Sequence, residues 1–240
     1  MIVLALLLVI SSLTSPGYAQ ETLVFNSQVT NRILGPQCVL NADNVLKEAL
    51  ESLGYSVKFI QYPPLRSLME VDSGHIDGES TLFEYNAKRF PNIVRVKEAV
   101  LEDMPIEAFM IKPPPFNPTP GPAVFGYVRG LFDPSPLVGH DHVVETDSGE
   151  SLFALLAKGR IDVAVFCRDA GLSLGQHLKI EGFTVVAHIA QVDVYVALNK
   201  RHADLAKSLS QVLLEMKHNG RYKTILSNEN DSYPDRTGHP

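Results

Sequence analysis

Residues 65–80 are LRSLMEVDSGHIDGES, and residues 150–165, ESLFALLAKGRIDVAV, repeat their pattern. In each copy an apolar helical pattern ends at a glycine, Gly74 or Gly159, and x-Ile-Asp then leads into a strand pattern. The two glycines are 85 residues apart, since 159 − 74 = 85. Helix–glycine–strand units are common in α/β proteins, so the repeat arises by chance or marks two lobes of related topology.

Strand and helix patterns alternate on both sides of the repeat. Strands are predicted at residues 22–26, 57–59, 76–80, 93–96, 106–111, 123–127, 143–146, 161–166, 183–187 and 192–196. Helices are predicted at residues 43–53, 64–74, 148–158 and 203–216, the third with a capping box formed by Asp147 and Glu150. The proline-rich residues 112–122, KPPPFNPTPGP, form a connector between the halves. This alternation predicts an α/β fold.

Composition excludes several classes of protein. The 240 residues are 45% hydrophobic and 20% charged, which suits one large globular domain or two small ones. A net charge of −6 argues against nucleic-acid binding. Two cysteines, Cys38 and Cys167, are too few for a disulfide scaffold, and we expect two separate thiols. No Cys/His cluster has the spacing of a zinc site, so no metal and no cofactor are expected.

The first residues have the pattern of a signal peptide. Residues 2–10 are an unbroken apolar run, and small residues follow at the positions that precede a cleavage site. The run is too short to span a bilayer. We therefore expect residues 1–19 to be removed near Ala19 and the rest to be exported to the periplasm, with a polar tail at residues 229–240.

A resemblance to a known family covers most of residues 22–226. The segments that carry it, in order, are PPLRSLMEVDSGHIDGES, FPNIVRVKEAV, FGYVRG, LLAKGRIDVAV and YVALNKRHADLAKSLSQVLLEMKHNGRYKTIL. Together they resemble the periplasmic solute-binding proteins of ABC importers, in the amino-acid-type family 3. The resemblance implies two α/β lobes joined by a hinge of two crossover strands, in a type II periplasmic-binding fold. It places residues 20–109 and 191–228 in lobe one and residues 110–190 in lobe two.

The resemblance also implies a function. A monomer of this kind, with no enzymatic activity, captures a small polar or anionic metabolite between its lobes and delivers it to a membrane permease. Two alternatives stay open at this point. Some proteins with this fold are dehydratases, for which Glu79, Asp169 and an arginine offer acid–base groups; others present a ligand to a membrane sensor.

Matching the family residue by residue suggests a binding site. Arg89 falls at the position of the arginine that clamps a ligand carboxylate, and Arg66 or Arg129 offers the same chemistry. Two positions depart from amino-acid binders: Gly130 is followed by no hydroxyl residues, and Cys167 replaces the acid that pairs with the ligand ammonium. The resulting set of ligand-binding residues is Arg66, Glu79, Ser80, Arg89, Tyr127, Arg129, Gly130, Cys167 and Asp169.

Overall fold

The computed structural model describes residues 20–28, 37–83, 88–112 and 121–227. The expected signal peptide, the polar tail, most of the proline-rich connector and the side chain of Cys38 lie outside this description. Among the described residues, no helix combines the length and the apolar character that crossing a membrane requires.

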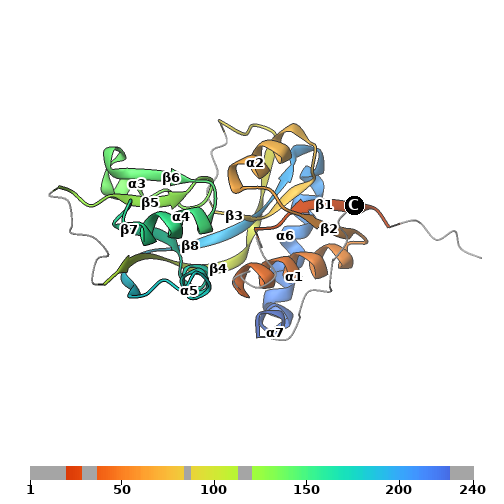
Figure 1. Cartoon of the computed structure of the whole chain (residues 1–240). Coiled ribbons are helices and arrows are strands. Elements are labelled where there is room, and N and C mark those ends of the chain that lie inside the picture. Colours follow the sequence, from red (N-terminus) through yellow and green to blue (C-terminus); the bar gives the residue numbers. More distant parts are fainter. Residues whose placement is uncertain (1–19, 29–36, 84–87, 113–120, 228–240) are drawn as a thin grey trace, which may run out of the picture.

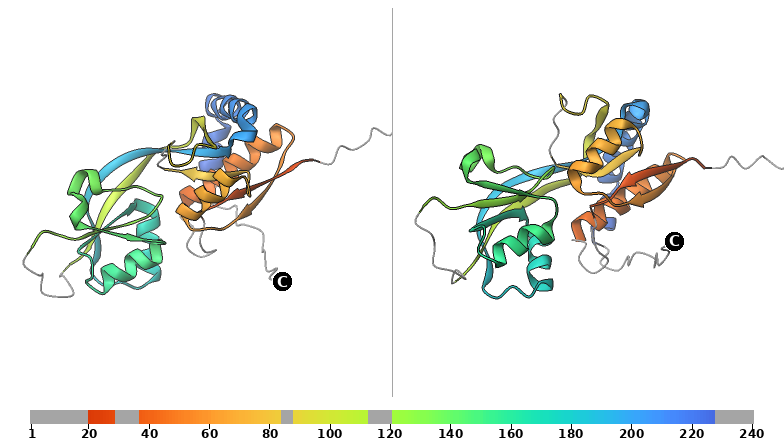
Figure 2. Two further views of the ribbon diagram at one scale, coloured as in Figure 1. Left: turned by 90° about the horizontal axis from the view of Figure 1, so that it is seen from above. Right: turned by 45° about the horizontal axis from the view of Figure 1, so that its top comes forward.

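Two α/β lobes lie side by side and are joined by a pair of long strands (Figures 1 and 2). Lobe one contains β1 (Thr22–Asn26), α1 (Gln37–Ser52), β2 (Ser56–Ile60), α2 (Pro64–Ser73), β3 (Gly78–Leu82), η2 (Lys200–His202), α6 (Ala203–His218) and α7 (Arg221–Ser227). Lobe two contains β5 (Phe125–Val128), α3 (Ser135–Val138), η1 (His140–His142), β6 (Val143–Thr146), α4 (Gly149–Ala157), β7 (Val163–Cys167) and α5 (Arg168–His177). The connecting strands are β4 (Ile93–Ile111) and β8 (Phe183–Asn199). The expected two-lobed architecture is confirmed, whereas the exact residue limits of the lobes remain our assignment.

The connecting strands form the hinge. The sheet order is β2-β1-β3-β8-β4-β7-β5-β6, so the antiparallel pair β8–β4 stands between the strands of the two lobes. The sequence predicts four short strands here, but the structure has two long ones, because β-bulges absorb the breaks in alternation. One break is at Asp103, which has a φ of 54° and whose amide donates to the Asp193 carboxylate at 3.1 Å. The hydrogen-bonded sheet is therefore continuous through the hinge.

The sequence repeat corresponds to a repeated contact. Asp77 in lobe one accepts a hydrogen bond from the Val24 amide at 2.7 Å, and its own amide donates to the Val24 carbonyl at 2.8 Å. Asp162 in lobe two makes the same two contacts with Val124, both at 2.8 Å. In each lobe the aspartate thus ties the start of one parallel strand to its neighbour. The sequence repeat therefore corresponds to a structural unit that both lobes share, in which an aspartate binds the backbone of the neighbouring strand.

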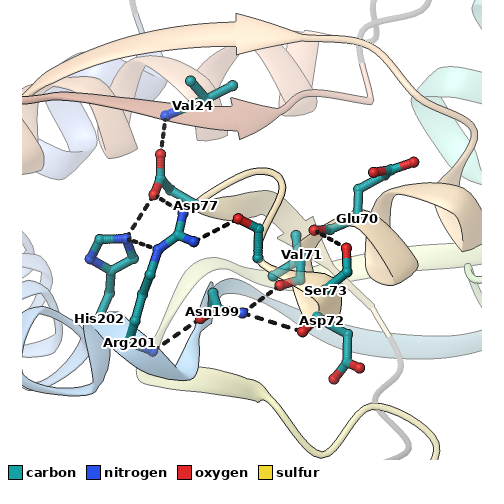
Figure 3. Close-up of polar contacts among 10 residues, drawn as sticks. Val24, Glu70, Val71, Asp72, Ser73, Asp77, Asn199, Arg201 and His202 are labelled. Carbon is teal, nitrogen blue, oxygen red and sulfur yellow. Dashed lines mark hydrogen bonds and ion pairs between the residues drawn. The ribbon is translucent and has the colours of Figure 1, made fainter.

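Lobe one adds a polar cluster around Asp77 (Figure 3). Arg201 donates to Asp77 Oδ1 at 2.6 Å and to the carbonyl oxygen of Gly74 at 2.6 Å, and His202 Nε2 lies 2.7 Å from the same carboxylate oxygen. Burial disfavours ionisation of Asp77, but the hydrogen bonds from the Val24 amide, Arg201 and His202 outweigh it and lower the pKa. The cluster fastens the end of β8 to the loop between α2 and β3.

Several predicted element ends are shifted. Helix α1 begins at Gln37, six residues earlier than predicted, and α5 and α7 are helices that the sequence analysis did not single out. The predicted capping box is wrong in one respect: the N-cap of α4 is Ser148, whose hydroxyl accepts from the Ser151 amide at 3.2 Å, and not Asp147. Gly74 ends α2 as predicted, with a φ of 79° in the left-handed region.

Candidate ligand-binding site

A cavity of about 230 Å³ lies between the two lobes. Its lobe-one wall follows the carboxyl ends of β1, β2 and β3 and consists of Gln28, Gln61, Tyr62, Pro63, Pro64 and Phe83. Its lobe-two wall combines the turn at residues 147–150 with the apolar side of Val128, Leu131, Phe166, Cys167, Ala170 and Leu174. Carboxyl ends of parallel strands are where ligands bind in open α/β sheets. This interlobe cavity is therefore the candidate ligand site.

A buried carboxyl group organises the lobe-one wall. Glu79, 1% exposed, accepts hydrogen bonds from Asn26 Nδ2 at 2.8 Å, from Gln28 Nε2 at 3.3 Å and from the Ser67 hydroxyl. Asn26 in turn accepts from the amide of Tyr62 at 2.6 Å. Glu79 therefore lies behind the wall, where it connects β1, the β2–α2 segment and α2, and it fixes Gln28 and Tyr62 at the cavity.

A second buried carboxyl group lies in the same lobe. Asp43 accepts from the Ser27 hydroxyl at 2.5 Å, and Ser80, which is also fully buried, lies beside it. Burial raises the pKa of Asp43 and that of Glu79 to about 7, although the neighbouring hydroxyl and amide donors oppose the change. Two of the residues next to β1, Ser27 and Gln28, are thus held by carboxyl groups that are removed from solvent.

The turn before α4 brings acidic groups to the opposite wall. Asp147 and Glu150 line the cavity on either side of the Ser148 cap, and Asp147 also accepts a hydrogen bond from Arg129. The sequence analysis considered these acids only as helix-capping residues. Their approach to lobe one depends on how the lobes meet, which no local pattern encodes.

A second cavity between the lobes, of about 560 Å³, collects four of the predicted binding residues: Arg89, Tyr127, Arg129 and Gly130. Its polar groups pair with one another, since the Tyr127 hydroxyl donates to Glu145 at 2.7 Å and Arg129 lies 3.7 Å from the same carboxylate. Burial and the contact with Glu145 raise the pKa of Tyr127 well above its usual value.

The other predicted residues lie in different places. Cys167 is buried at the first cavity, whereas Glu79 and Ser80 lie behind its wall. The side chain of Arg66 is 62% exposed and pairs with Glu70 at 3.4 Å. Asp169 lines a third cavity of about 200 Å³, next to the hinge and α7. The structure therefore does not gather Glu79, Asp169 and an arginine around one cavity, as the dehydratase alternative requires.

The cavity residues that the sequence analysis missed are mostly apolar or amide-bearing. Tyr62, Phe83 and Phe166 contribute aromatic rings, and Gln28 contributes an amide. Such residues carry no spacing that separates a cavity wall from a protein core. The local signal for Gln28, Tyr62 and Phe83 is that they follow predicted strands, whereas Phe166 is the last residue of the strand predicted at residues 161–166.

Comparisons with known proteins agree with this architecture. No family model matches the chain. An uncharacterized protein of Shewanella oneidensis is 26% identical over 207 residues, 81% of this chain and 77% of that protein. A histidine kinase sensor domain with similarity to periplasmic binding proteins has a TM-score of 0.68 at 18% identity, over 86% of this chain and 95% of the other.

Two further solved structures are binding proteins. An ancestral arginine-binding protein bound to arginine has a TM-score of 0.69 at 18% identity, over 87% of this chain and 97% of the other. An arginine 3rd transport system periplasmic binding protein from Legionella pneumophila has a TM-score of 0.67 at 12% identity, over 86% and 98%. These likenesses extend over 86% to 87% of the chain. The chain therefore has the type II periplasmic-binding fold.

Proposed function

We propose that this protein is an exported, monomeric solute-binding protein that captures a small molecule in the cavity of about 230 Å³ and delivers it to an ABC importer. The single observation that carries the proposal is that both lobes build the cavity, while the strands β4 and β8 connect the lobes as a hinge. Opening at a hinge admits a ligand, and closure removes it from water.

The contact between the lobes supports closure around a ligand. Gly130 of lobe two, with a φ of 84°, packs against the backbone of Pro64 and Leu65 at the start of α2. Leu131 follows directly and lines both interlobe cavities. This contact therefore forms the boundary between the two cavities and closes one side of the first.

The structural neighbours support binding more than catalysis. They include binding proteins of amino-acid transport and a sensor domain. Since the acid–base groups of the dehydratase alternative lie apart, we propose a binding role without turnover. The likeness to the sensor domain favours one second candidate, in which the loaded protein signals to a membrane kinase.

Native mass spectrometry of protein purified from the exported fraction tests capture. We expect a population that carries one small molecule and loses it on unfolding. A library of amino acids, amines, carboxylates and dipeptides, screened by thermal shift, supplies an independent arm. The proposal would be refuted if native mass spectrometry shows protein without a ligand and no compound of the library raises the melting temperature.

Uptake of the compound identified in this way separates transport from sensing. Cells that lack the protein should lose high-affinity uptake and regain it when the protein is restored. Unchanged uptake, with a loss of the transcriptional response to the compound, would favour the sensor role instead.

A further inference from the structure

Apolar side chains from both lobes make up most of the cavity wall. Tyr62 and Phe83 contribute aromatic rings from lobe one, and Phe166 contributes a ring from lobe two. Other apolar side chains complete the wall: Pro63, Pro64, Val128, Leu131, Ala170 and Leu174. Such a wall favours a ligand whose own apolar surface leaves water when it binds.

The ring from lobe two is held in place by its neighbours. Phe166 packs edge-to-face on Phe153, and the ring centres are 6.0 Å apart. A Cβ atom on Gly149 would lie only 3.1 Å from the Phe166 ring and 2.6 Å from Leu174, so this glycine lets both side chains lie against the start of α4. The ring is therefore positioned before a ligand arrives, which reduces the entropy that binding costs.

The ring of Tyr62 already has a cationic partner. The guanidinium of Arg66 lies 4.8 Å from its centre, within the range of cation–π attraction. A second cation at the same ring would be repelled by Arg66. This ring therefore suits an uncharged group of a ligand better than a cation.

The charged groups at the wall do not complement a charged ligand body. Asp147 binds the guanidinium of Arg129, and Glu150 also has an interaction of its own. A cationic body would have to compete with Arg129 for Asp147. An anionic body would meet no lysine, arginine or histidine among the described residues that line the cavity. Either body would lose its hydration without gaining a counter-ion.

The amide of Gln28 is neutral and selects neither charge. Its Nε2 atom donates one hydrogen bond to the buried Glu79 carboxyl at 3.3 Å, which orients the amide. A primary amide has a second N–H and a carbonyl oxygen, so Gln28 offers the cavity both a donor and an acceptor. The apolar part of the wall, and not this amide, therefore distinguishes one ligand from another.

From these contacts we infer that the cavity selects a ligand with an uncharged aromatic body, which lies against rings from both lobes. The inference rests on the proposed function and deepens it by naming the ligand class of the same cavity. The polar head group of the ligand is not part of the inference, so the test varies the head group and the body independently.

Three sets of compounds, each with one head group and different bodies, test the class by calorimetry. They are phenylalanine with arginine and glutamate, 3-phenylpropionate with 4-guanidinobutanoate, and 2-phenylethylamine with agmatine. Whichever head group the cavity accepts, we expect the phenyl compound of that set to bind at least about 10-fold more tightly than its charged counterparts, because a charged body loses hydration at an apolar wall.

Phe83→Leu and Phe59→Leu are matched variants that locate the interaction. Both residues are partly buried phenylalanines of lobe one that pack against the same core, but Phe59 lines neither interlobe cavity. Phe83→Leu should weaken the tightest phenyl compound about 3- to 10-fold, because an aromatic contact is lost. Phe59→Leu should leave its affinity unchanged, although a general loss of core packing would affect both variants.

The outcomes separate the ligand class from the function. A charged compound that binds as tightly as the phenyl compound of its set would overturn the class and leave capture standing, and so would equal effects of the two variants. If none of the sets binds while another compound of the library does, the function holds; an uncharged aromatic body in that compound supports the class, and any other body overturns it. If no compound binds and native mass spectrometry shows no ligand, both proposals fail.

Discussion

Gly130 in lobe two and Leu65 in lobe one are in van der Waals contact through their backbones, so that a Cβ atom at Gly130 would lie only 2.9 Å from the Leu65 nitrogen. Glycine at this position thus lets the second lobe rest on the start of α2. The interlobe cavity lies beside this contact, since Pro64 and Leu131 line it. The closeness of the lobes depends on the absence of one side chain.

Gly130→Ala should push the lobes apart. The substitution adds the steric conflict with Leu65 to the strain of a φ of 84°, which alone costs about 1 to 2 kcal/mol for a residue with a Cβ atom. We expect lower stability in urea and a larger radius of gyration by X-ray scattering. Gly54→Ala is the control, because Gly54 has a φ of 85° but no atom within 4 Å of its added Cβ. An equal radius of gyration for the two variants would show that the contact between Gly130 and Leu65 does not hold the lobes together.

The two buried carboxyl groups predict how stability depends on pH. Glu79 and Asp43 have pKa values of about 7 in the folded protein and ordinary values of 4.5 and 3.8. At pH values between the ordinary and the raised pKa, the folded state therefore binds more protons than the unfolded state. The free energy of unfolding should therefore fall as the pH rises from about 4 to about 7 and level off above it. For Glu79 the change is on the order of 3 kcal/mol.

Isosteric amides check this pH dependence. Glu79→Gln and Asp43→Asn cannot ionise, so each should flatten the decline between about pH 4 and about pH 7, as measured by urea unfolding at a series of pH values (about one pH unit apart). Glu51→Gln, at an exposed position of α1, should leave the decline as it is in the unmodified protein. A decline that persists in the double variant Glu79→Gln/Asp43→Asn would assign it to other groups.

The repeated aspartates should differ in importance. Asp77→Ala removes the acceptor for the Val24 amide, Arg201 and His202, and we expect a loss of about 3 kcal/mol because several donors lose a partner. Asp162→Ala removes an exposed acceptor that binds the Val124 amide, and about 1 kcal/mol is expected. Urea unfolding of both variants compares them, and a larger loss for Asp162→Ala would contradict the structural role given to the Asp77 cluster.

The sequence predicted local elements well where caps and periodicity define them. Gly74 ends α2, and the strand at residues 143–146 has the predicted limits. The hinge strands β4 and β8 were predicted as four pieces, because bulges such as the one near Asp103 interrupt alternation without ending the strand. Pairing between distant strands, and not local propensity, maintains them.

The site was harder to predict, for a different physical reason. Cys167, named from the sequence, lines the cavity, whereas Glu79 lies behind its wall and contacts Gln28 and Asn26. Arg66 carries the chemistry of a clamp but is turned to Glu70, because a guanidinium on an exposed helix face finds its partner within one turn. The residue type predicts which groups a side chain can bind. Which of these groups lie close enough to bind is decided by the packing of the folded chain.

A thermal-shift comparison of the unmodified protein with Leu131→Trp tests capture between the lobes most directly. Leu131 lines the cavity, so the larger indole should fill it, whereas Leu214→Trp places the same change on α6 at a residue that is 43% exposed. At about 100 times its dissociation constant a ligand adds about 2.7 kcal/mol, which corresponds to roughly 5 to 10 °C for a chain of this size. We predict that a compound from the library of amino acids, amines, carboxylates and dipeptides gives this shift in the unmodified protein and in Leu214→Trp but not in Leu131→Trp. Equal shifts in all three proteins, or no shift in any, would contradict the account.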